Sequence, residues 1–71
     1  MKLRRLTFVK DCCNGLFCPN IFEDENGDFL VVGTETTSVV RDHLPADAGC
    51  DETESVVRIP RAILMDAAKN L

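Results

Sequence analysis

The sequence predicts an α+β fold, in which a small antiparallel sheet of three to four strands has one C-terminal helix packed on a face. Asn26-Gly27 stands between two apolar runs, and this dipeptide is the strongest short signal for a β-hairpin. Pro60 precedes a stretch of helical apolar periodicity, and proline suits the first helical position because that N–H has no partner within the helix. Because a helix over an antiparallel sheet is a stable two-layer arrangement, we expect residues 1–71 to form a single domain.

The hairpin is expected to pair Ile21–Glu23 with Phe29–Val32. A two-residue loop would set Glu25 opposite Asp28, whereas a three-residue loop would set Asp24 opposite Asp28, and the sequence leaves both open. Phe29–Val32 is apolar on both faces, which predicts a central strand of the sheet.

Three further strand segments are indicated by alternating or apolar residues. The first strand is expected over Leu3–Val9, with Leu6 and Phe8 on one face. Val39-Val40 is expected to extend a strand after the hairpin, and Ser55–Ile59 to form the last short strand.

The helix that follows Pro60 has an apolar stripe and an opposite polar side. Met65 falls on the polar side with Arg61 and Lys69, and we predict these three residues to contact a partner. A single helix covers a single face of the sheet, so a homodimer through the bare second face is a further expectation. The apolar stripe comprises Ile63, Leu64, Ala67, Ala68 and Leu71.

Charge and hydropathy exclude two classes of partner. The net charge is −4, and residues 1–10 hold four of the eight basic residues and none of the twelve acidic ones. The rest of the chain therefore repels phosphates, and we do not expect it to bind nucleic acid.

No segment has the roughly 20 apolar residues of a membrane span. The basic start lacks the apolar stretch of a signal peptide, so we expect a cytoplasmic protein with reduced thiols.

Four residues have the chemistry of a zinc site: Cys13, Cys18, His43 and Cys50. Thiolate and imidazole are the donors that tetrahedral zinc prefers, and the spacing of Cys13 and Cys18 is a permitted ligand spacing. The alternative is that Cys18 is a small buried hydrophobe and that the other thiols have no function.

Two other kinds of site are weighed against simpler interpretations. A Cys18 nucleophile with His43 as its base needs a proximity that nothing in the sequence indicates. The carboxylates of residues 23–28 supply oxygen ligands for calcium, but their spacing differs from that of an EF-hand loop. We interpret them as a charged hairpin tip that keeps the sheet edge soluble.

Several short motifs follow one another along the chain. They are Cys18-Pro19, the turn at Gly27, Val32-Gly33, and Val57-Arg58-Ile59-Pro60 leading into Ile63-Leu64. In these features, residues 18–64 resemble a group of small, mostly uncharacterised actinobacterial proteins that are often encoded beside helix-turn-helix regulators. The resemblance implies an accessory role in which a small protein modulates a transcription regulator by contact, and it implies no catalytic residue.

Together these observations predict a non-enzymatic accessory protein that acts by protein–protein contact, without a cofactor. The alternative is a small zinc-stabilised binding module that uses Cys13, Cys18, His43 and Cys50.

Overall fold

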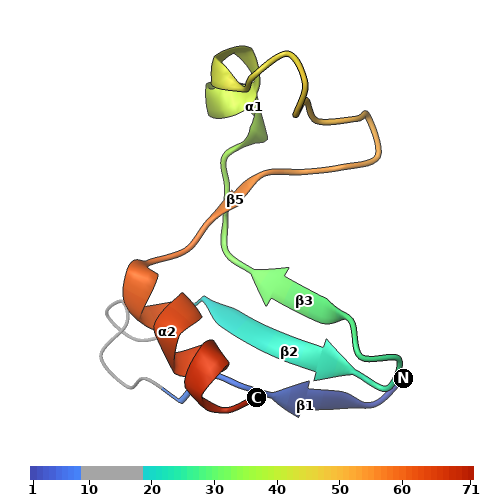
Figure 1. Cartoon of the computed structure of the whole chain (residues 1–71), viewed down its shortest axis with the longest axis vertical. Coiled ribbons are helices and arrows are strands. Elements are labelled where there is room, and N and C mark those ends of the chain that lie inside the picture. Colours follow the sequence, from blue (N-terminus) through green and yellow to red (C-terminus); the bar gives the residue numbers. More distant parts are fainter. Residues whose placement is uncertain (9–18) are drawn as a thin grey trace.

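The computed structural model describes residues 1–8 and 19–71, which form a body and an arm (Figure 1). The α+β prediction is confirmed, because a three-stranded antiparallel sheet, a separate two-stranded sheet and a C-terminal helix are present. The body comprises β1 (Leu3–Arg5), β2 (Asn20–Asp24), β3 (Phe29–Val32) and α2 (Arg61–Lys69). The arm comprises β4 (Thr34–Glu35), α1 (Thr37–Val40), the 3-10 helix η1 (Arg41–His43) and β5 (Val57–Arg58).

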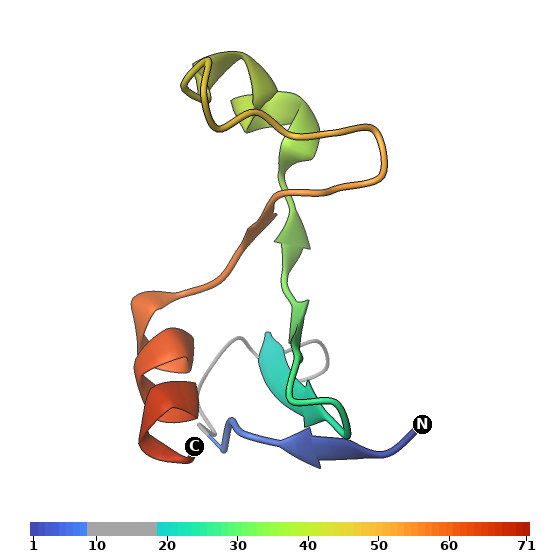
Figure 2. The same ribbon diagram turned by 45° about the vertical axis from the view of Figure 1, so that its right-hand side comes forward.

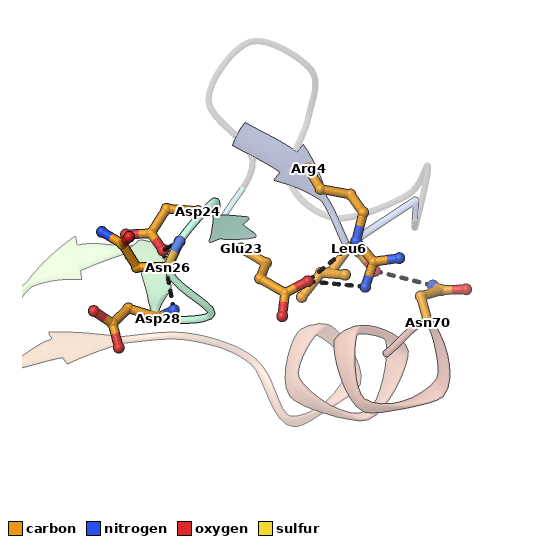
Figure 3. A network of polar contacts seen from close by, with 7 residues as sticks. All are labelled: Arg4, Leu6, Glu23, Asp24, Asn26, Asp28 and Asn70. Atoms are coloured by element: carbon orange, nitrogen blue, oxygen red, sulfur yellow. Dashed lines mark hydrogen bonds and ion pairs between the residues drawn. The ribbon is translucent and has the colours of Figure 1, made fainter. Parts of the chain in front are cut away.

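The hairpin between β2 and β3 has a three-residue loop, which decides between the two registers left open by the sequence. Asp24 N donates to Asp28 O at 2.9 Å, and Gly27 N donates to Asp24 O at 3.2 Å. Gly27 has a φ of 86°, a conformation that glycine adopts without steric cost. Asp24 Oδ1 also accepts the N–H groups of Asn26 and Asp28, at 2.9 and 3.0 Å, and so holds the turn (Figure 3).

The strand order β1-β2-β3 makes β3 an edge strand, so its prediction as a central strand was wrong. Phe29, Val31 and Val32 are exposed. The apolar residues on both faces of β3 were interpreted as a sign that the strand is buried between two neighbouring strands. In this structure β3 is instead a sheet edge that lacks the charged residues or prolines that usually protect an edge strand from pairing with other chains.

β1 ends earlier than predicted because the chain turns from the sheet towards α2. Leu6 N still donates to Ile21 O at 2.9 Å, but Phe8 N donates to Asp66 Oδ2 of α2 at 2.6 Å. Phe8 is therefore exposed while Leu6 is buried, and the expected shared face was wrong. Buried Thr7 Oγ1 donates to Asn20 Oδ1 at 2.8 Å.

The core lies between α2 and the β1–β2 side of the sheet, and the described residues that form it are Leu6, Ile21, Ile63 and Ala67. Pro60 is the residue immediately before α2, one position earlier than expected. The C-terminal end of the helix is fastened to the sheet by Asn70, whose Nδ2 donates to Leu6 O at 2.9 Å (Figure 3). Only part of the predicted apolar stripe is buried: Leu64, Ala68 and Leu71 are exposed.

The arm rises from the body on two chain segments, β4 and β5, which pair with Thr34 opposite Arg58 (Figure 2). The radius of gyration is 13.5 Å, against about 11 Å for a compact chain of this length.

Val39-Val40 lies in α1, so the expected strand there was wrong. Glu35 Oε1 accepts the N–H of Thr37 at 2.7 Å and so satisfies a donor of the first helical turn.

Candidate protein-binding groove

An apolar groove runs between α2 and β3, with a volume of about 180 Å³. Buried Leu6 and Ile21 form its floor, and its walls come from the helix and the edge strand. Its lining is Leu6, Ile21, Phe29, Val31, Leu64, Ala67, Ala68 and Leu71.

Local periodicity explains why these side chains meet. Residues alternate between the faces of a strand, and the register sets Val31 opposite Ile21, so Phe29 and Val31 face the side that α2 covers. On the helix, Leu64 and Ala68 are four residues apart and lie on one side, and Leu71 follows just after the helix ends. The relative exposures of Phe29, Leu64 and Leu71 are 52%, 57% and 67%. The side chains of the groove walls are therefore largely exposed to solvent.

The carboxylates of the hairpin turn are not part of the groove lining. Glu25 lines a separate hollow with Lys2, Leu3 and Arg4. The side chain of Asp28 lies on the sheet face opposite to that of Phe29, because successive residues of a strand alternate between faces.

The acidic tip, which we define as Asp24, Glu25 and Asp28, directly precedes Phe29, and the C-terminal end of α2 is the end nearer to it (Figure 1). Glu23 pairs with Arg4 at 3.0 Å (Figure 3). Within residues 1–8 and 19–71, no basic side chain forms an ion pair with the acidic tip.

The predicted partner-contact residues lie beside the groove rather than in its lining. Arg61, Met65 and Lys69 are all exposed and follow one another at four-residue spacing along α2. This stripe borders Leu64 and Ala68, and its role in binding stays a prediction.

The structure places half of the predicted zinc ligands. Cys13 and Cys18 lie outside the described residues, so the zinc and thiol-nucleophile hypotheses stay untested. His43 is exposed in η1, and Cys50 is half-buried in the arm. Arg41 Nη1 donates to Cys50 O at 2.8 Å, which holds the Cys50 backbone beside the helical turn that carries His43. In the part of the chain that the structure describes, no three His, Cys, Asp or Glu side chains gather as a metal site would require.

The carboxyl group of Glu35 is expected to titrate with a midpoint below the ordinary glutamate value of 4.5. Its pKa is lowered by hydrogen bonds from the Thr37 side chain and from the Thr37 backbone N–H. A pKa that is lower in the folded than in the unfolded state stabilises the fold above the unfolded value, and this stabilisation is lost as the pH falls through the folded value. NMR titration of the Glu35 carboxyl carbon measures the midpoint. Thr37→Ala should raise it towards 4.5, and a wild-type midpoint at or above 4.5 would contradict the hydrogen bonding.

Comparison with protein-family models, curated proteins and solved structures found no match. The resemblance carried by residues 18–64 therefore stays a prediction. None of the helices in the described ranges combines the length and hydrophobicity that crossing a bilayer requires.

Proposed function

We propose that this chain is a small non-catalytic accessory protein that acts by contact with another protein through the groove between α2 and β3. The observation that carries the proposal is the exposure of Phe29, Leu64 and Leu71 around one apolar groove. Contiguous exposed apolar surface on a small domain is typical of an interaction site.

The free energy of burying the groove side chains and the volume of the groove both support a protein as the ligand. Full burial of a Leu or Phe side chain contributes about 1.5–3 kcal/mol, so covering a few groove residues supplies useful affinity. The groove volume of about 180 Å³ is below the roughly 300–1,000 Å³ of most small-molecule sites, but suits inserted side chains.

The partner that we propose is a transcription regulator. The resemblance of residues 18–64 to proteins encoded beside helix-turn-helix regulators supports this choice. The net charge of −4 disfavours direct contact with DNA phosphates, so an effect on transcription would pass through the regulator.

Site-specific photo-crosslinking in the source cells tests this proposal. A benzoylphenylalanine at Leu64 should yield a discrete crosslink to one protein, whereas the same group at Val39, which lies in the arm and is slightly more exposed, should not. The Kd measured with the purified partner should rise at least tenfold in Leu64→Glu and less than twofold in Val39→Glu. Equal crosslinking from both positions, or none from Leu64, would contradict the proposal.

A further inference from the structure

We draw no further inference here: the strongest candidate, the apolar groove between α2 and β3 together with the sheet edge at β3 beside it, carries no proposal beyond the function proposed above because nothing in the structure shows what covers it.

Discussion

Replacing Ile63 with alanine is expected to lower the free energy of unfolding by about 2–5 kcal/mol. Ile63 is 2% exposed and packs in the core with Leu6, Ile21 and Ala67. The substitution removes buried methyl groups and leaves a cavity that the surrounding backbone fills only in part. A chain of this size has a total stability of about 4–10 kcal/mol, so the variant should unfold at a much lower urea concentration.

Met65→Ala is the matched control on the same helix. Met65 is 63% exposed, and its truncation should change the unfolding free energy by no more than about 0.5 kcal/mol. Urea denaturation followed by circular dichroism measures both variants. Equal losses would show that α2 does not dock through the Ile63 face.

Gly33→Ala is expected to destabilise the protein by about 1–3 kcal/mol through overpacking at the base of the arm. A Cβ at this position would lie 2.7 Å from Arg58 O and 2.8 Å from Ile59 Cγ2. Arg58 O belongs to the backbone of β5, so relief requires a shift of the chain that leads back into the body.

Gly49→Ala separates this crowding from a general effect of replacing glycine. No atom lies within 4 Å of a Cβ built at Gly49, so the change should be neutral or stabilise the fold by up to about 1 kcal/mol. Thermal unfolding of both variants gives the comparison. Amide NMR shifts caused by Gly33→Ala should concentrate at Thr34, Arg58 and Ile59, and a loss of similar size in Gly49→Ala would contradict the contact.

Local chemistry in the sequence was sufficient to predict the hairpin and the C-terminal helix. Asn26-Gly27 supplies the positive φ that the turn needs, and Pro60 directly precedes α2. The segment after Gly33 was harder, because Val39 and Val40 favour a strand on their own. There the hydrogen bonds of Glu35 with Thr37, and of Thr36 with Val56, place the start of a helix instead.

The groove was missed because apolar patterning does not distinguish residues that bury within the chain from residues that bury against another. Phe29 and Val31 were assigned to a central strand, and Leu64 and Leu71 to the buried stripe of the helix. A signal was present: a single nine-residue helix covers too little of the sheet to bury this many apolar positions. The sequence therefore indicated a binding surface through an excess of apolar residues rather than through a motif.

The pairing of β4 with β5 brings the two ends of the arm together on the body. Thr34 and Arg58 are direct partners in that ladder, and the Cα atoms of antiparallel partners are about 4.5–5.5 Å apart. Residues 35–57 thus form an insertion whose two ends lie side by side at the body, as the ends of an inserted domain do. A tight two-residue turn spans the same gap, so we expect that such a turn, or an inserted reporter domain, can replace residues 35–57 while the groove is kept.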